Sequence, residues 1–236
     1  LMGLRFPNRV GLAAGMDKNA RHVRAWSALG FGFVEVGTVT PQPQPENARP
    51  RLFRLPAAGG LINRMGFNND GAAMVAARLA GRRDGAVVGV NIGKNAATPA
   101  EGAVEDFRAV MRAVYGVADY LAVNVSSPNT AGLRDWQAAP ALDALLGALV
   151  EERGRLTAVH GREVPLTVKL APDLSDEELA AAAECVARHP VAAVIATNTT
   201  TARDAVAGLK HGQEAGGLSG RPLRERSTRM IAALRG

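Results

Sequence analysis

The sequence is poor in cysteine, aromatic residues and lysine, and it lacks any long apolar run. Cys185 is the single cysteine, so an internal disulfide is excluded and a reducing compartment is compatible. Its setting, AAAECVARH, favours a small buried core residue over a reactive thiol. No apolar stretch approaches the length of a membrane span, so no membrane-crossing helix is expected within these residues.

Aromatic residues make up 4% of the 236-residue chain, and no run of five Lys or Arg occurs, although the net charge is +6. Because nucleic-acid surfaces combine aromatic residues with clustered cations, this composition argues against a nucleic-acid partner. Arg outnumbers Lys by 24 to 4. Lys18, Lys94 and Lys169 follow apolar runs, where a compact ammonium can reach a ligand, although chance would explain the placement too.

Six short apolar runs predict strands because they are rich in β-branched residues. They cover residues 10–18, 33–40, 87–95, 120–129, 166–172 and 193–200. Helices are predicted over residues 18–29, 70–83, 99–115, 138–159, 175–188 and 222–235. Two of these helices begin at sequences typical of a capping box, Thr98 to Glu101 and Ser175 to Glu178.

This alternation predicts a single α/β domain with a parallel sheet covered by helices. A Rossmann fold would carry G-x-G-x-x-G after its first strand, but the sequence there reads AAGMDKN. Polar residues instead end several strands, as in a (β/α)8 TIM barrel. Asn124 and Ser126 alternate with Val123 and Val125, and Lys169 alternates with its apolar neighbours, so all three polar side chains should face the barrel mouth. The sequence therefore predicts a TIM barrel with about six of the eight βα units present.

One long insertion, residues 41–69, interrupts the series. It starts Pro-rich and then predicts two short strands around Ala58 to Gly60. We expect this segment to form a hairpin over the barrel mouth.

Eight motifs occur in the order AAGMDKN, EVGTVTPQPQPENARPRLFRL, LINRMGFNN, NIGKN, NVSSPNTAGLR, VKLAPD, ATNTT and GGLSGRPL. Each is weak alone, but together they cover the chain from about residue 7 onward, and in this order they resemble the motifs of the dihydroorotate dehydrogenase family. The resemblance implies oxidation of dihydroorotate to orotate in de novo pyrimidine (UMP) biosynthesis. A proton would leave C5 of the substrate, and a hydride would pass from C6 to FMN.

The catalytic base implied by the resemblance is Ser127. A Ser at this position is typical of class two, the quinone-reducing form, whereas soluble class one usually carries Cys. Because no histidine lies in a motif, we expect Ser127 to act through a bound water or a neighbour such as Thr130. Taken without the other motifs, Ser-Ser-Pro is a common turn sequence.

FMN is the cofactor that the resemblance implies. Lys169 matches the family lysine whose charge stabilises reduced flavin near N1, and Lys18 matches a lysine that touches flavin and substrate. Gly220 matches a glycine near the flavin phosphate. All positions matching flavin contacts are Ala14, Gly15, Met16, Asp17, Lys18, Thr38, Asn91, Asn124, Lys169, Thr197 and Gly220.

Dihydroorotate and orotate carry amide-like edges and a carboxylate, which suit asparagine amides and cations. The positions that match the family's substrate contacts are Lys18, Asn63, Arg64, Met65, Gly66, Phe67, Asn124, Asn129, Asn198 and Thr199. No metal site is expected, because the histidines are scattered and no carboxylate cluster sits at the predicted strand ends.

Two parts of the family pattern have no match in this sequence: the N-terminal helical extension of class two and the last two βα units. We therefore expect residues 1–236 to be a single FMN-binding barrel domain, incomplete as a fragment. The resemblance places the protein peripherally at the cell membrane, on the cytoplasmic side, through the missing extension, with a quinone as electron acceptor. The alternatives are a soluble class one relative that uses fumarate or NAD, and a non-catalytic remnant that binds orotate or flavin.

Overall fold

The structure is a computed structural model that describes residues 1–82 and 85–235. Six parallel strands form its centre, in the order β1-β2-β5-β6-β7-β8. Their bounds are β1 (Gly11–Leu12), β2 (Phe33–Val39), β5 (Val87–Ile92), β6 (Tyr120–Asn124), β7 (Leu166–Leu170) and β8 (Ala193–Ala196). Each of the six predicted apolar runs contributes one of these strands, so the prediction of a parallel α/β sheet is confirmed.

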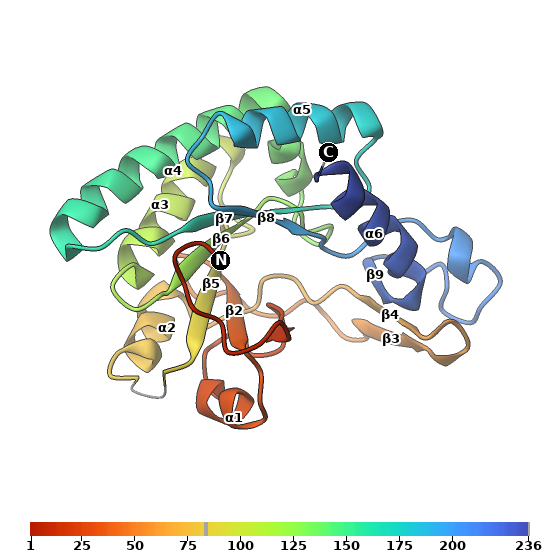
Figure 1. Cartoon of the computed structure of the whole chain (residues 1–236). Helices are drawn as coiled ribbons and strands as arrows, with labels where there is room; N and C mark the ends of the chain where they lie inside the picture. The colour runs from red at the N-terminus through yellow and green to blue at the C-terminus, as the bar shows by residue number, and fades with distance from the viewer. Residues whose placement is uncertain (83–84, 236) are drawn as a thin grey trace.

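The helices form an outer layer against one face of this curved sheet (Figure 1). Their bounds are α1 (Val23–Ala28), α2 (Ala72–Leu79), α3 (Ala103–Val114), α4 (Ala139–His160), α5 (Asp176–Ala187) and α6 (Arg224–Ala233). Among the described strands, β1 and β8 are the two edges and do not pair with each other. The six strands therefore form a half-barrel, as the count of βα units predicted.

Alternate residues of the strands separate an apolar face from a polar one. Val34, Val36, Val123 and Val168 are fully buried in the core between sheet and helices. Glu35, Tyr120, Thr167 and Lys169 have the opposite parity and line the concave face. The predicted inward direction of Lys169 is thus confirmed, and it follows from the two-residue period of a strand.

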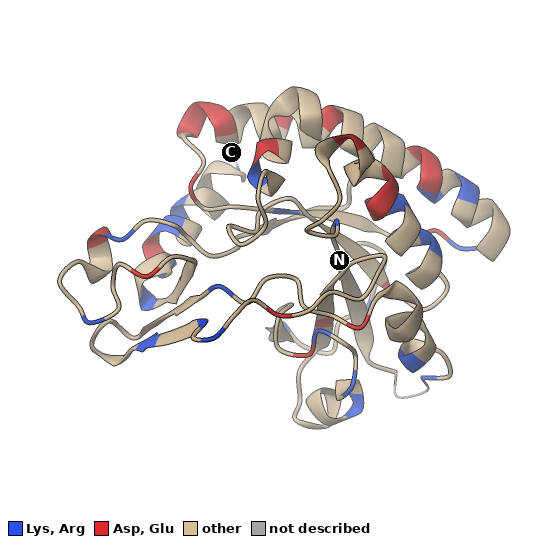
Figure 2. Cartoon of the chain, turned by 180° about the vertical axis from the view of Figure 1, so that it is seen from behind, with Lys and Arg blue, Asp and Glu red and all other residues tan. Residues whose placement is uncertain are grey.

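Charged residues of both signs occur along the outer helices, whereas the central strands carry few (Figure 2). Cys185 is fully buried in the main core, as its apolar setting predicted. No helix in the part of the chain that the structure describes has the length and apolar character needed to cross a membrane.

The insertion after β2 forms the predicted hairpin, with β3 (Leu52–Leu55) and β4 (Gly60–Asn63) antiparallel. A short 3-10 turn, η1 (Pro56–Ala58), joins them. A third strand that the sequence did not reveal, β9 (Gly217–Gly220), pairs with β4. This small sheet has its own apolar cluster, which includes Phe53, Ile62 and Leu218. It therefore brings a motif near the end of the chain beside the insertion (Figure 1).

One of the two expected capping boxes forms. Ser175 Oγ accepts from the Glu178 N–H at 3.2 Å, and Glu178 Oε2 accepts from the Ser175 N–H at 2.8 Å. The expected box at Thr98 is wrong, because a 3-10 turn (η2, Ala100–Gly102) follows Pro99 and α3 begins only at Ala103. The backbone of Thr98 instead serves its own loop, where its carbonyl accepts from Lys94 Nζ at 2.9 Å.

Candidate active site at the carboxyl ends of the strands

Three polar side chains from three neighbouring strands bind one another at the carboxyl end of the sheet. Thr38 on β2 donates to Asn91 Oδ1 at 2.5 Å, and Asn91 lies on β5. Asn124, the last residue of β6, donates to Thr38 Oγ1 at 2.9 Å and to Asn91 Oδ1 at 3.1 Å. All three are buried, so these hydrogen bonds offset the cost of removing the polar groups from water. These hydrogen bonds bring three of the predicted site residues together at the strand ends.

A buried carboxylate lies beneath this cluster. Glu35 accepts from Asn91 Nδ2 at 2.9 Å and from the Tyr120 hydroxyl at 3.0 Å, and the Lys169 ammonium lies 4.0 Å from its Oε1 atom. Burial, reinforced by the Glu35 charge, raises the pKa of Tyr120 far above its ordinary value, so the phenol stays protonated and donates. Sequence reasoning gave Glu35 no role, although its parity already placed it on the same face as the other polar residues.

A cavity of about 900 Å³ opens beside Lys169 and Thr197 on the concave face. Apolar side chains of the first residues, including Leu4 and Phe6, line much of it. Lys169 Nζ donates no hydrogen bond to the described residues, and its nearest charge partner is the Glu35 oxygen at 4.0 Å. A nearly buried ammonium with free donors beside a cavity is suited to an anionic or electron-rich ligand.

The loop after β6 carries the predicted base. Ser127 is 5% exposed, and its Oγ atom accepts from the Asn129 N–H at 3.2 Å. No hydrogen bond joins Ser127 to Thr130, so the expected assistance from Thr130 is not seen in this arrangement of the described residues. The neighbouring Ser126 donates from its hydroxyl to Asn124 Oδ1 at 2.9 Å and accepts from Asn198 Nδ2 at 3.0 Å. Asn198 therefore joins the loop after β8 to the loop that carries Ser127.

The NRMGF segment sends its side chains in different directions. Asn63 lies beside Asn129, whose Nδ2 donates to the Asn63 carbonyl and Oδ1 at 3.3 Å each. Phe67 is buried in the main core. Arg64 turns toward the small sheet, where it pairs with Glu214 at 2.8 Å and lies over the Phe53 ring. Met65 and Gly66 are half-buried.

Lys18 crosses from the loop after β1 to the same segment. Its ammonium donates to the Gly66 carbonyl at 2.8 Å and to Asn68 Oδ1 at 2.6 Å. Burial and the positive charge of Arg51 lower the pKa of Lys18 to about 8, so its charge titrates near neutral pH.

The other residues of the AAGMDK turn are placed differently. Asp17 is buried and accepts from the Arg21 and His22 N–H groups at 2.8 Å each, so it holds the start of α1. Met16 is 68% exposed. The Gly15 N–H donates to the Gly37 carbonyl at 3.0 Å, which ties the turn, with Ala14, to β2.

Gly220, Thr197 and Thr199 lie at the edge of this arrangement. Gly220 has a φ of +93° and pairs with Gly60, and a Cβ there would collide with the Gly59 carbonyl. The pairing of β9 with β4 already requires this glycine. Thr197 donates to the Asn198 carbonyl at 2.8 Å, and the Thr199 N–H donates to Asn198 Oδ1 at 2.8 Å.

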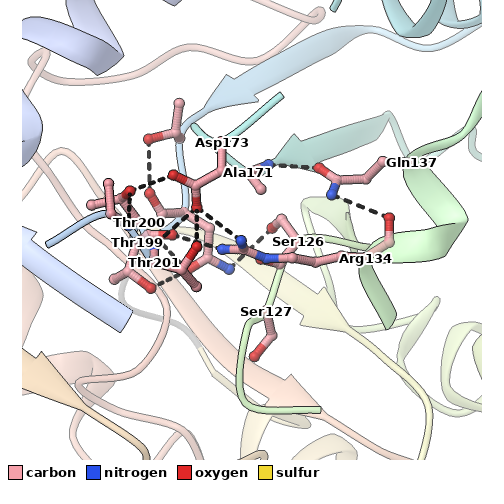
Figure 3. A network of polar contacts seen from close by, with 12 residues as sticks. Ser126, Ser127, Arg134, Gln137, Ala171, Asp173, Thr199, Thr200 and Thr201 are labelled. Carbon is pink, nitrogen blue, oxygen red and sulfur yellow. Dashed lines mark hydrogen bonds and ion pairs between the residues drawn. The ribbon is translucent and has the colours of Figure 1, made fainter. Parts of the chain in front are cut away.

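Two residues that the sequence did not single out, Arg134 and Asp173, bridge these loops (Figure 3). Both lie inside motifs, in AGLR and APD, but they are 39 residues apart and no local spacing marked them as partners. One group of metal-capable side chains, Asp143, Cys185 and His189, comes together on α4 and at the end of α5. It lies outside the strand ends, and Arg188 already binds the Asp143 carboxylate at 3.2 Å.

A half-barrel of βα units with amides, a buried ammonium and a loop hydroxyl at the carboxyl strand ends defines an enzyme of the βα-barrel class. The family model "Dihydroorotate dehydrogenase" matches residues 1–236. The chain belongs to the dihydroorotate dehydrogenase family.

Two individual relatives carry the name of the quinone-dependent form of this family. The chain is 57% identical over 234 residues to "Dihydroorotate dehydrogenase (quinone)" of Methylococcus capsulatus, a match that covers 99% of this chain and 69% of the relative. It is also 57% identical over 238 residues to the protein of the same name from Methylibium petroleiphilum, covering 69% of that relative. A crystal structure of DHODH from Eimeria tenella in complex with ferulenol superposes with a TM-score of 0.91 at 40% identity, covering 98% of this chain and 67% of that one.

The chain thus spans about two thirds of the length of its relatives. Its function is the quinone-dependent oxidation of dihydroorotate to orotate in pyrimidine biosynthesis. The family is generally FMN-dependent.

Proposed function

We propose that residues 1–236 form the part of a barrel domain that binds FMN and dihydroorotate, with Ser127 as the catalytic base. One observation carries this proposal: Asn124, Asn198 and the loop of Ser127 are joined by direct hydrogen bonds at the carboxyl ends of the strands. Four asparagines around the loop that carries Ser127 suit a planar substrate with amide edges. The two outer ones, Asn63 and Asn129, bind each other at 3.3 Å.

The residues at hand fit FMN on chemical grounds. Lys169 offers a nearly buried ammonium whose donors have no acceptor among the described residues, and it faces the cavity together with Thr197. FMN, when bound, accepts the hydride from the substrate. Lys169 would hold the flavin ring, and Thr38, Asn91, Asn124, Thr197 and the Ala14 to Lys18 turn would contact the cofactor. Gly220 would lie near the phosphate, where its lack of a side chain permits close backbone approach.

Different side chains would take the substrate's proton, bind its ring and attract its charge. Ser127 would take the proton from C5 of dihydroorotate, and its burial excludes bulk water from that step. Asn63, Asn124, Asn129 and Asn198 would bind the ring amides, with Thr199 and the backbone of residues Arg64 to Phe67 completing the pocket. Lys18 would attract the anionic substrate, because its ammonium lies against the NRMGF segment.

We further propose that electrons pass to a membrane quinone and that the protein acts peripherally at the cytoplasmic side of the cell membrane. The names of the relatives support the acceptor, since both are described as quinone enzymes. A lipid-soluble acceptor requires a site at the membrane surface. Fractionation of cells that express the complete gene product should place it with the membranes and release it with mild detergent.

The central test uses the complete gene product, loaded with FMN and freed of oxygen. Adding dihydroorotate should bleach the flavin absorption, and a quinone should restore it. Ser127→Ala should slow bleaching by a factor of about 100 or more, as expected for a lost general base. Bleaching restored by fumarate or NAD but not by quinone would point to a class one enzyme. If flavin binds but dihydroorotate does not bleach it, the protein binds its ligands without catalysing the oxidation.

A further inference from the structure

Asp173, in the loop after β7, gathers groups from three other parts of the chain. Its Oδ2 atom accepts from Arg134 Nη1 at 2.8 Å and from the Thr201 N–H at 2.9 Å. Its Oδ1 atom accepts from the Thr200 hydroxyl and from Arg226 Nη1, which lies 2.6 Å away on α6. Burial alone would raise the pKa of Asp173, but these hydrogen bonds outweigh it and hold the pKa below its usual value. The carboxylate is therefore charged at neutral pH.

Arg134, on the 3-10 turn η3 (Leu133–Gln137), spans three segments with its three nitrogens. Nη1 binds Asp173, Nε donates to the Ser126 carbonyl at 3.1 Å, and Nη2 donates to the Thr199 carbonyl at 2.9 Å. Figure 3 shows the guanidinium between these groups. A planar guanidinium can serve three acceptors in fixed directions, whereas a lysine ammonium has a single nitrogen and cannot span them.

The two carbonyls that Arg134 binds belong to the two loops that carry the proposed base and a proposed substrate amide. The Ser126 carbonyl is part of the peptide that leads into Ser127. The Thr199 carbonyl belongs to the residue directly after Asn198, whose side chain donates to Ser126 Oγ at 3.0 Å. The loop of the base and the loop of the substrate amide are thus joined twice, once by their own side chains and once through Arg134.

We infer that Arg134, anchored by Asp173, is a positioning residue that fixes the loop of Ser127 relative to the loop of Asn198 and makes no contact with dihydroorotate. This inference rests on the proposed roles of Ser127 and Asn198. Proton transfer depends steeply on the distance between base and substrate, so a small shift of the Ser127 loop slows it strongly. Substrate affinity, spread over several asparagines and Lys18, should respond much less.

The charges of the pair agree with this reading. The Asp173 carboxylate offsets the Arg134 charge and is itself bound by Arg226, so the guanidinium is engaged within the protein. If Arg134 instead bound the substrate carboxylate, replacing it would lower the affinity for orotate. The two roles therefore predict different measurements.

The test compares Arg134→Lys, Arg134→Ala and Asp173→Asn in the complete FMN-loaded protein with a matched control, Arg112→Lys. Arg112 also joins separate elements, since it binds Glu152 on α4 at 2.6 Å, but it lies on the outer helix layer. Anaerobic flavin bleaching by saturating dihydroorotate gives the rate of the chemical step, and titration with orotate gives the affinity. Thermal melting and flavin content report folding.

We expect bleaching to be about 10- to 100-fold slower in Arg134→Lys and Asp173→Asn, with orotate affinity changed by less than about threefold. Low concentrations of guanidinium ion should partly restore the rate of Arg134→Ala but not alter the Arg112 control. A rate like that of the control at equal stability would overturn the inference. So would a loss of orotate affinity at an unchanged rate, which would assign Arg134 to substrate binding. If the unmodified protein does not bleach at all, the proposed function fails, and this outcome is distinct from the others.

Discussion

The Lys169 ammonium lies 4.0 Å from the Glu35 carboxylate, and neither side chain is more than 10% exposed. Glu35 also binds Asn91 and Tyr120, so the same carboxylate supports the amide cluster and faces the proposed flavin lysine. A cation placed beside a carboxylate that cannot move away is held in one position and is partly neutralised.

Replacing Glu35 by Gln should therefore destabilise the protein and alter the flavin. The neutral amide loses charge-assisted hydrogen bonds, so the free energy of unfolding should fall by about 1–3 kcal/mol in urea titrations. The unopposed charge of Lys169 should also make the reduction potential of bound FMN more positive. Tyr120→Phe removes one hydrogen bond but keeps the carboxylate charge, and it serves as the control. An unchanged potential in Glu35→Gln would contradict the proposed contact between Lys169 and the flavin.

Orotate binding should weaken as the pH rises through about 8. The pKa of Lys18 is lowered to about 8 by burial and by the Arg51 charge, so the ammonium that attracts the anion is lost above that pH. Affinity measured by flavin absorption should fall by up to about tenfold per pH unit beyond this point. Lys18→Met should bind weakly at every pH, with a flat profile. A steep fall that persists in Lys18→Met would assign the titration to another group.

Asn124→Asp should be more harmful than its small change in shape suggests. The side chain donates to Thr38 Oγ1 and to Asn91 Oδ1, and a carboxylate at this position would face the Asn91 oxygen without a donor. The residue is 3% exposed, and the Ser126 and Asn198 donors that already bind Oδ1 leave the second carboxylate oxygen without a donor in place of the two hydrogen bonds that Nδ2 made. Stability should fall by about 2–4 kcal/mol, measured by chemical unfolding, and orotate binding should be lost with it. A free energy of unfolding of Asn124→Asp that stays within about 0.5 kcal/mol of the parent value would contradict the tightly hydrogen-bonded arrangement of the cluster.

Two glycines offer a matched pair of alanine substitutions. Gly220→Ala should lower the free energy of unfolding by about 1–3 kcal/mol, because its φ is +93° and the new Cβ would collide with the Gly59 carbonyl. Gly154→Ala should raise it by about 0.5–1 kcal/mol, because that residue lies within α4 and nothing surrounds its missing Cβ within 4 Å. Equal effects at the two positions would contradict the described pairing of β9 with β4.

Local features of the sequence were sufficient for most of the fold. Each apolar run became a strand because length and β-branched content limit the backbone choice, and the two-residue period placed Lys169 and Asn124 on the inner face. The Ser175 capping box formed because all its partners lie within four residues. The Thr98 box does not form, although its residues are equally close in the sequence. Lys94 binds the Thr98 carbonyl, and a 3-10 turn follows Pro99 in place of the first turn of the helix.

The composition and motif order of the sequence determined the class of fold, the family and the set of candidate residues. Only the tertiary structure decided which of these residues meet. It turned Arg64 toward Glu214, set Asp17 to hold α1, paired β9 with β4, and joined Arg134 to Asp173. Apart from the local contact of Asp17 with the start of α1, these contacts join positions that lie far apart along the chain, for example 150 residues apart for Arg64 and Glu214. A single sequence carries no local signal for such pairs, because they depend on how the loops of separate βα units pack together at one end of the sheet.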